Sequence, residues 1–182
     1  FIDAMNHLVG LGHRQIAYLG GDPDLNYAWQ RREGFLSAAK THGCDVPSGY
    51  VFDNITDEMA ARRAVTELLK LPNRPTALLC VTDAVAIGAI HALAHAGIEV
   101  GSEISVIGFD GLPMGEAIHP GLTTMSQASY QIGREVGRIV VAQANAPASE
   151  LSQILWEASL TIRGSANPPA QKSVTNAKGG IS

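Results

Sequence analysis

Four short apolar runs alternate with segments of helical periodicity between the N-terminus and residue 110. Strands that alternate with helices at short intervals form a parallel sheet through right-handed crossovers. Continuous apolar runs are typical of strands that are covered on both faces. The sequence therefore predicts an α/β fold in which a parallel sheet lies inside a three-layer sandwich. The predicted strands are Gln15–Leu19, Tyr50–Asp53, Ala77–Val81 and Ile104–Phe109, and the predicted helices are Asp3–Leu11, Asn26–Thr41, Asp57–Leu71 and Ala84–Ala96.

Capping signals support these helices. Asp3 is the expected N-cap of the first helix and Gly12 its end, and Thr82-Asp83 precedes the helix that Gly97 ends. Short polar side chains accept hydrogen bonds from the first free amides of a helix, and glycine suits the turn after its last residue.

The alternation changes after Asp110. A loop with several Pro and Gly residues is expected over Leu112–Gly121, and a strand over Leu122–Met125. Ser126 is the expected cap of a long amphipathic helix that reaches Asn145. Residues Ala146–Ser149 form a connection to a last strand, Ile154–Ile162, and the polar residues 166–182 are expected to be disordered.

The composition is that of a globular domain and excludes several classes of function. With 182 residues, 46% hydrophobic and 16% charged, the chain holds one sizeable core or one domain plus part of another. Its formal charge of −4 argues against a nucleic-acid surface, which needs clustered Lys and Arg. No apolar run has the length of a membrane span, so no membrane partner is expected.

The N-terminal residues and the cysteines indicate the context of this sequence and its cellular environment. Phe1-Ile2-Asp3 has neither an initiator Met nor the basic and apolar regions of a signal peptide, so we expect the sequence to begin inside a longer chain. Cys44 and Cys80 fit no metal-ligand spacing and favour a reduced, cytoplasmic environment.

Asp110 ends the predicted strand Ile104–Phe109. In open α/β sheets, ligands bind outside the carboxyl ends of the strands, so this carboxylate is a binding candidate. The alternative is that Asp110-Gly111 only begins a turn, and this residue pair alone favours the turn.

Further polar residues follow the other strands at the same edge. They include Arg31 in the segment after the first strand, and Thr82 and Asp83 after the third. An Arg/Asp pair across a cleft suits vicinal hydroxyls or a planar polar ring, and Tyr27, Trp29 or Phe109 would cover an apolar face. The alternative places Arg31 and Arg32 in solvent and the aromatic rings in the core, and composition alone favours it.

The motifs for metal and catalytic chemistry are incomplete. His91 and His95 have the spacing of two metal ligands on a helix, but the acid of the His-Glu-x-x-His motif is missing, so no metal is expected. Gly20-Gly21 is too short for a dinucleotide fingerprint, and there is neither a phosphate loop nor a nucleophile elbow. The sequence therefore predicts no enzyme and no cofactor.

An ordered set of short motifs resembles one family. The set runs from His7-Leu8 through Leu11-Gly12-His13-Arg14, Ile16-Ala17, Gly20-Gly21, Arg31, Gly34-Phe35, Val106–Asp110 and Leu122–Thr124 to Arg163-Gly164-Ser165. Over about residues 3–166 the chain resembles the effector-binding region of lactose-repressor/galactose-repressor (LacI/GalR) type transcription regulators. Such proteins have a DNA-binding helix-turn-helix and a two-lobed, periplasmic-binding-protein-like (type I) core that binds a sugar or purine between its lobes.

The resemblance implies a division of the chain between the two lobes. Residues 1–111 would belong to the C-terminal lobe, 112–148 to a segment that returns to the N-terminal lobe, and 149–165 to a second pass through the C-terminal lobe. The helix to Asn145 would then lack its neighbours, and we expect it to repack, to swap with another copy or to be disordered.

The resemblance also implies the site residues. Arg31 would clamp the effector and Asp110 would bind it, Thr82 stands where the family often has Asn, and Ile55 stands where an aromatic often stacks. Gln127 would reach the ligand from the first-lobe side, with Tyr27 as an addition. A homodimer surface is implied on the helix Ala84–Ala96 and the loop after Asp110, with Ala89, Leu93, Met114 and Ile118 as its apolar residues.

The function so implied is a sugar-responsive, cytoplasmic transcription regulator whose DNA-binding domain lies outside this sequence. Two alternatives stay open. One is an extracytoplasmic sugar-binding protein of a transporter, which an upstream signal peptide would favour. The other is a doubly wound enzyme with a nucleotide cofactor, which the missing glycine fingerprint argues against.

Overall fold

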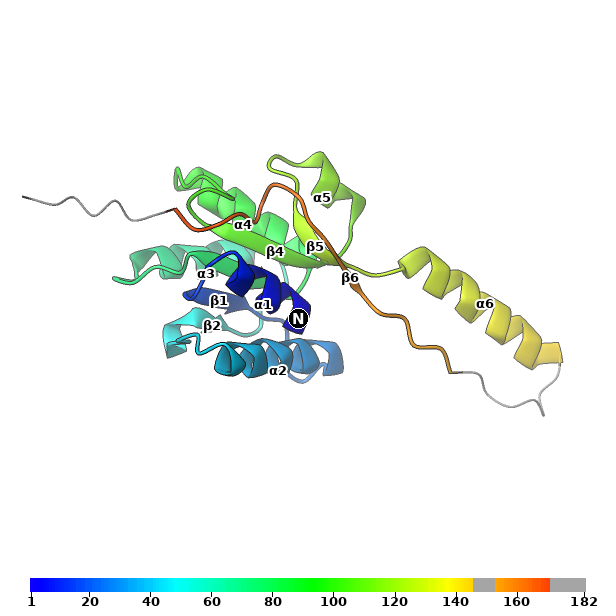
Figure 1. Ribbon diagram of the computed structural model, residues 1–182. Coiled ribbons are helices and arrows are strands. Elements are labelled where there is room, and N and C mark those ends of the chain that lie inside the picture. Colours follow the sequence, from blue (N-terminus) through cyan, green and yellow to red (C-terminus); the bar gives the residue numbers. More distant parts are fainter. Residues whose placement is uncertain (146–152, 171–182) are drawn as a thin grey trace, which may run out of the picture.

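A six-stranded sheet of order β2-β1-β3-β4-β5-β6 forms the centre of the computed structural model (Figure 1). The structure describes residues 1–145 and 153–170. Neighbouring strands from β2 to β5 are parallel, and β6 pairs antiparallel with β5. The strands are β1 Ile16–Leu19, β2 Val51–Phe52, β3 Ala77–Cys80, β4 Ser105–Asp110, β5 Thr123–Ser126 and β6 Ser159–Thr161.

Two pairs of helices cover the two faces of the sheet. The side chains of Ile16 and Tyr18 on β1 pack with α1 and α2, whereas those of Ala17 and Leu19 pack with α3 and α4. Alternate residues of a strand face opposite sides, so β1 contributes to both halves of the core. The predicted α/β three-layer sandwich is confirmed. The helices are α1 Ile2–Gly10, α2 Asn26–Thr41, α3 Glu58–Lys70, α4 Asp83–His95, α5 Pro113–Ala117 and α6 Ser129–Asn145.

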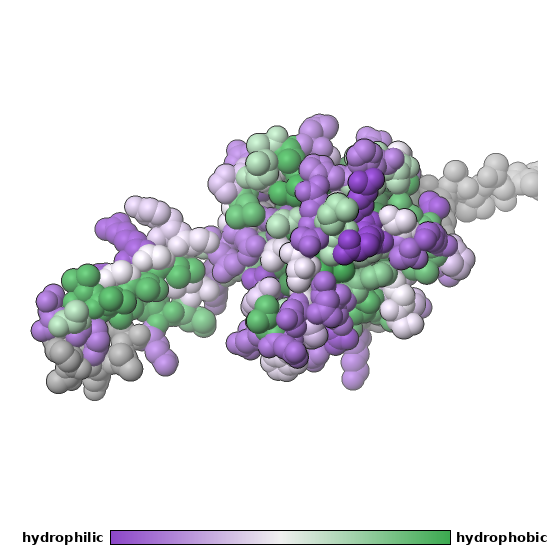
Figure 2. Space-filling view, turned by 180° about the vertical axis from the view of Figure 1, so that it is seen from behind, coloured by the Kyte–Doolittle hydropathy of each residue, from purple (hydrophilic) through white to green (hydrophobic). Residues whose placement is uncertain are grey.

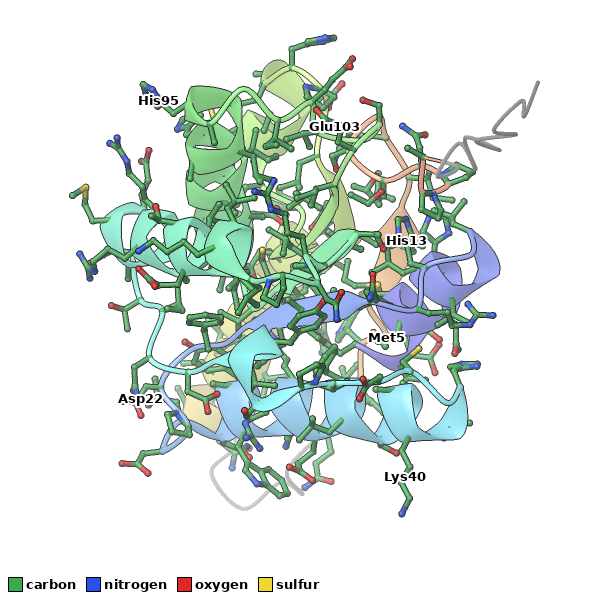
Figure 3. All side chains as sticks on the ribbon, turned by 90° about the vertical axis from the view of Figure 1, so that its left-hand side faces the viewer. Met5, His13, Asp22, Lys40, His95 and Glu103 are labelled. Atoms are coloured by element: carbon green, nitrogen blue, oxygen red, sulfur yellow. The ribbon has the colours of Figure 1, made fainter. Side chains whose placement is uncertain are left out.

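The carboxyl and amino edges of the sheet lie on opposite sides of the molecule. His13 precedes β1 and Asp22 follows it, and the two lie far apart in Figure 3. Because the strands are parallel, the residues that follow β1, β3 and β4 gather on the side of Asp22.

The expected cap at Thr82 is confirmed, those at Asp3 and Ser126 are wrong, and Asp57 is a cap that the sequence analysis did not name. The Asp57 carboxylate accepts from the Ala60 amide at 2.7 Å, and the Thr82 hydroxyl accepts from the Val85 amide at 3.3 Å. The N-cap of α1 is Phe1. Asp3 lies in the first turn, where its negative charge still interacts favourably with the helix dipole.

Several element boundaries differ from the sequence-based expectation. Tyr50 lies in a short 3₁₀ turn before β2, and the expected loop Leu112–Gly121 contains α5, which has Pro113 at its start. Ser126 is the last residue of β5, paired with Ser159, and α6 begins three residues later. The final strand is limited to Ser159–Thr161 because only these residues pair with β5.

The expected boundary after residue 111 does not coincide with an edge of the sheet. β5 continues the same sheet beside β4, with Asp110 opposite Ser126. The strand β5, Thr123–Ser126, is therefore part of the same sheet as the strands of residues 1–111.

The start of the C-terminal segment is ordered, which corrects the expectation of disorder from residue 166. Ala166 is 3% exposed in the core. The Asn167 carbonyl accepts hydrogen bonds from His13 Nε2 and Ser105 Oγ, each at 2.9 Å. These contacts outweigh the polar composition of the segment, and residues 171–182 of the expected tail lie outside the described residues.

Helix α6 projects away from the sheet (Figure 1). None of its residues is buried, and Val136, Val140 and Val141 are 55–61% exposed. Figure 2 shows apolar side chains gathered along this projecting part of the molecule. An amphipathic helix with its apolar face in solvent lacks the surface that would normally cover it.

Candidate binding site at the carboxyl edge of the sheet

Arg31 and Asp110 meet at the carboxyl edge. Arg31 comes from the second turn of α2, and Asp110 is the last residue of β4. Arg31 Nη2 lies 3.8 Å from Asp110 Oδ1, and their side chains are only 15% and 28% exposed. This distance is too long for a hydrogen bond but short enough for strong attraction, so both groups keep hydrogen-bonding capacity for a third partner.

The Asp110 carboxylate accepts one hydrogen bond and lies beside the Arg31 charge. Gln127 Nε2, just after β5, donates to Asp110 Oδ1 at 3.1 Å. Burial raises the pKa of Asp110, while the Arg31 charge and the Gln127 hydrogen bond act in the opposite direction. The backbone of Asp110 has φ 129°, a region that non-glycine residues rarely adopt. Strained backbone of this kind gathers at ligand sites, which argues for a binding role over a simple turn.

The Arg31 guanidinium is fixed by a carbonyl and two aromatic rings. Its Nη1 donates to the Val81 carbonyl at 2.6 Å. Its Cζ lies 3.7 Å from the centroid of the Phe109 ring and 5.0 Å from that of Tyr27. Burial lowers the pKa of Arg31, but an arginine stays charged in a protein. The alternative that Arg31 is a solvated surface residue is thus wrong.

Asp83 is a structural residue whose importance sequence analysis missed. It is fully buried, and its carboxylate accepts from the Leu112 amide at 2.7 Å and from the Thr124 hydroxyl at 2.6 Å. A Cβ on Gly108 would overlap Asp83, so glycine is required there. The three partners are distant in sequence, and no local pattern marks them as a group.

The structure does not bring two of the predicted site residues into direct contact with the Arg31–Asp110 pair. The Thr82 hydroxyl is engaged in capping α4. Ile55 is 8% exposed and packs in the core between the sheet and helices α3 and α4. Both remain predictions as effector contacts, whereas Arg31, Asp110, Gln127 and Tyr27 form one cluster.

The predicted dimer residues divide into two groups. Ala89 and Leu93 are fully buried in the chain's own core, so their assignment to an interface is corrected: this face of α4 packs on the sheet. Ile118 is half-buried against the same core, and Met114 is 59% exposed. On α4 the exposed side chains include His91 and His95.

The two histidines of α4 lie on its exposed side. His91 Nδ1 lies 2.8 Å from Glu58 Oε1, an ion pair when the histidine is protonated. Within residues 1–145 and 153–170, no three His, Cys, Asp or Glu side chains are grouped as metal ligands. In the same residues no helix has the length and apolar character needed to cross a membrane.

Comparison with known sequences assigns the class. Residues 5–166 match the periplasmic binding protein-like domain, and the chain belongs to this family. It is similar to the HTH-type transcriptional repressor CytR of Escherichia coli, with 32% identity over 163 residues, 90% of this chain and 48% of that protein. The probable HTH-type transcriptional repressor ExuR of Bacillus subtilis is 31% identical over 163 residues, 90% of this chain and 49% of that protein. The chain thus spans about half the length of these curated relatives.

Solved structures show the same fold. A LacI-family regulatory protein from Chloroflexus aggregans has 32% identity and a TM-score of 0.83, covering 91% of this chain and 60% of that one. A LacI-family regulator from Enterococcus faecium with bound ribose has 27% identity and a TM-score of 0.81, covering 92% and 62%. These relatives are transcription regulators, which favours that class over transport proteins and enzymes.

Proposed function

We propose that this chain is the effector-binding and dimerisation region of a sugar-responsive transcription regulator that acts in the cytoplasm. The observation that carries the proposal is the cluster of Arg31, Asp110 and Gln127 at the carboxyl edge of the sheet. A guanidinium donates and a carboxylate accepts, so together they match adjacent hydroxyls of a polyol. The similarity to a regulator solved with ribose supports a sugar as the ligand class.

The second half of the clamp is a first lobe outside this sequence. Helix α6 belongs to that lobe in our proposal, and its exposed apolar face would be covered there. The chain then passes between lobes after β5 and before β6, near residues 127 and 158, rather than after residue 111. Gln127, at the first of these passages, would sense both the ligand and the angle between the lobes.

The regulatory step is a shift between two lobe arrangements. An effector that touches both lobes stabilises the arrangement in which its contacts are complete, and a ligand shifts an equilibrium only by its difference in affinity for the two states. DNA would be bound by a helix-turn-helix outside this sequence, and the lobe angle would set the spacing of the two DNA-binding heads in a dimer.

A homodimer would use the exposed outer side of α3, α4 and α5. Between α3 and α4 lies a hollow of about 460 Å³ whose lining includes Met59, Arg62, His91 and His95. Met59 and Met114 are 60% and 59% exposed, and exposed methionine and arginine side chains are common at interfaces. Sedimentation of the Met59→Glu and Met114→Glu variants is expected to show monomers. Lys40→Glu, on the exposed side of α2 (Figure 3), is the matched control and is expected to stay dimeric.

The experiment that tests the regulator is a binding assay with the full-length protein and its operator DNA. We expect a sugar from a panel of neutral pentoses and hexoses to change operator affinity. Arg31→Ala and Asp110→Ala are expected to abolish that change while operator binding without sugar is retained. Arg74→Ala replaces an exposed arginine in the loop before β3, at the other edge of the sheet, and serves as control. If the full-length protein has a signal peptide and does not bind operator DNA, the regulator is ruled out in favour of a transport protein.

A further inference from the structure

Phe109 lies between the core and the candidate site. It is the residue before Asp110 in β4 and is half-buried. One neighbour of its ring is the Phe1 ring, stacked at a centroid distance of 5.7 Å and an interplanar angle of 19°. The other is the Arg31 guanidinium, whose Cζ is 3.7 Å from the ring centroid.

The row of aromatic rings continues into the core. Phe1 meets Tyr18 edge-on at 5.9 Å, and Tyr18 stacks on Phe35 at 5.2 Å. Tyr18 and Phe35 are fully buried. Rings packed in this way have little freedom to move, so the last ring, Phe109, is a rigid surface rather than a mobile side chain.

Without the Phe109 ring, the contacts of the guanidinium are a hydrogen bond to Val81, the Asp110 charge and the more distant Tyr27 ring, 5.0 Å from Cζ, and these leave its orientation open. The bond from Nη1 to the Val81 carbonyl fixes one nitrogen, but a planar group held at one nitrogen can still rotate about that bond. The Asp110 carboxylate is too distant for a hydrogen bond. The Phe109 ring, whose centroid is 3.7 Å from Cζ, is the nearer of the two rings and limits this rotation, because cation–π attraction and packing both favour a guanidinium stacked on a ring.

We infer that Phe109 is a positioning residue for Arg31. It holds the guanidinium plane so that Nη2 stays beside Asp110 and a ligand hydroxyl meets a donor and an acceptor at fixed positions. The inference deepens the proposed function, since it names the residue that preorganises the sugar clamp. Preorganisation of this kind raises affinity by removing the entropy cost of ordering a long side chain at binding.

The first test needs no ligand. In the isotope-labelled chain, NMR exchange measurements report rotation of the Arg31 guanidinium about its Cζ–Nε bond. Slow rotation with separate Nη signals is expected in the parent and in Phe109→Tyr, and fast rotation in Phe109→Leu. Phe52→Leu makes the same change at a half-buried phenylalanine of β2 and is the matched control, expected to leave Arg31 unchanged. Equal rotation in the parent and in Phe109→Leu would overturn the inference, because the Val81 bond and the Tyr27 ring would then suffice.

The second test is a double-mutant cycle in the full-length protein with D-ribose as probe. Phe109→Leu is expected to weaken ribose binding about tenfold, the size of a shielded cation–π contact, and Phe109→Tyr to restore it. In an Arg31→Lys background, which lacks a flat cation, Phe109→Leu is expected to change affinity less than about twofold. Equal losses in both backgrounds would mean that Phe109 acts on the ligand or the fold and not through Arg31. Failure of the parent to bind any sugar would count against the proposed function, whereas the NMR result alone decides whether Phe109 positions Arg31.

Discussion

The hydroxyl of Thr124 in β5 donates a hydrogen bond of 2.6 Å to the buried carboxylate of Asp83 at the start of α4. The second oxygen of that carboxylate accepts from the Leu112 amide at 2.7 Å. One side chain therefore joins the helix after β3 to the start of the β4–β5 connection and to β5, and this connection begins directly after the strained backbone of Asp110.

Removing this carboxylate is expected to destabilise the fold strongly. Asp83→Ala leaves a partly buried amide and a buried hydroxyl without their acceptor, which costs about 3 kcal/mol of unfolding free energy. Thr124→Ser keeps the hydroxyl and loses one methyl group, so we expect a loss of only about 1 kcal/mol. Urea unfolding of the two variants measures both values. A mild effect of Asp83→Ala would show that water replaces the carboxylate and that the connection does not depend on it.

Asp110 is expected to lower stability in exchange for ligand binding. Since burial raises its pKa, the folded state disfavours the charged form relative to the unfolded state. The stability gained from the protonated form is complete below the unfolded value of 3.8 and is lost as pH rises through the higher folded value.

Asp110→Asn is therefore expected to unfold at a higher temperature than the parent at pH 7, with the difference vanishing below the unfolded pKa. The same variant should bind sugar at least about tenfold more weakly, because a charge-assisted hydrogen bond is lost. Thermal unfolding at several pH values checks the expected stability, and a ribose titration checks the expected loss of affinity. A lower unfolding temperature at pH 7 would mean that attraction to Arg31 outweighs burial.

His13 is expected to make the fold sensitive to mild acid. It is 1% exposed, with Nδ1 2.8 Å from the Thr76 hydroxyl and Nε2 2.9 Å from the Asn167 carbonyl. Burial lowers its pKa from the ordinary value of 6.5. The neutral ring thus contributes stability that is complete above pH 6.5 and is lost as pH falls through the folded pKa.

The variant that isolates this effect is His13→Gln, which keeps a donor and an acceptor but does not titrate. Its stability is expected to fall less than that of the parent between pH 7 and 5, by urea unfolding at each pH. His42→Gln, at an exposed histidine bonded to Asn6, is expected to follow the parent curve. If His13→Gln also follows the parent, the acid sensitivity comes from other groups, such as the partly buried His7.

The apolar face of α6 is expected to contribute nothing to the stability of this chain by itself. Val136→Ser and Val140→Ser change side chains that are 55% and 61% exposed, so each effect should stay within about 0.5 kcal/mol. Val65→Ser, at a 1% exposed core position of α3, is the contrast and should cost about 2 kcal/mol or more. In the longer protein the α6 variants are expected to become destabilising, because in our proposal the first lobe covers that face. An equal effect in both proteins would argue against this placement of α6.

Much of the fold was predictable because its signals are local. The order of strands and helices follows from hydrophobic periodicity, and Asp57 and Thr82 cap their helices through amides only three residues away. The Arg31–Asp110 pair followed from a different argument. Parallel strands end at one edge, so residues that follow different strands had to meet, and the family resemblance selected this pair among several polar residues there.

The errors concern features that distant contacts decide. Ala89 and Leu93 are apolar positions of an almost wholly apolar helix, and only packing against the sheet shows that they face inward while His91 and His95 face solvent. Asn167 lies in a polar segment, yet its carbonyl is held by His13 and Ser105, more than sixty residues away in sequence.

The sequence by itself determined the α/β class, the succession of elements and the residue types at the sheet's carboxyl edge, since these depend on neighbours along the chain. Only the tertiary structure decided that the buried Asp83 links α4 to β5, that Gln127 donates to Asp110 and that the Phe109 ring lies 3.7 Å from Arg31 Cζ. Each of these contacts joins elements whose relative position is set by packing of the whole sheet, and no local pattern encodes that position.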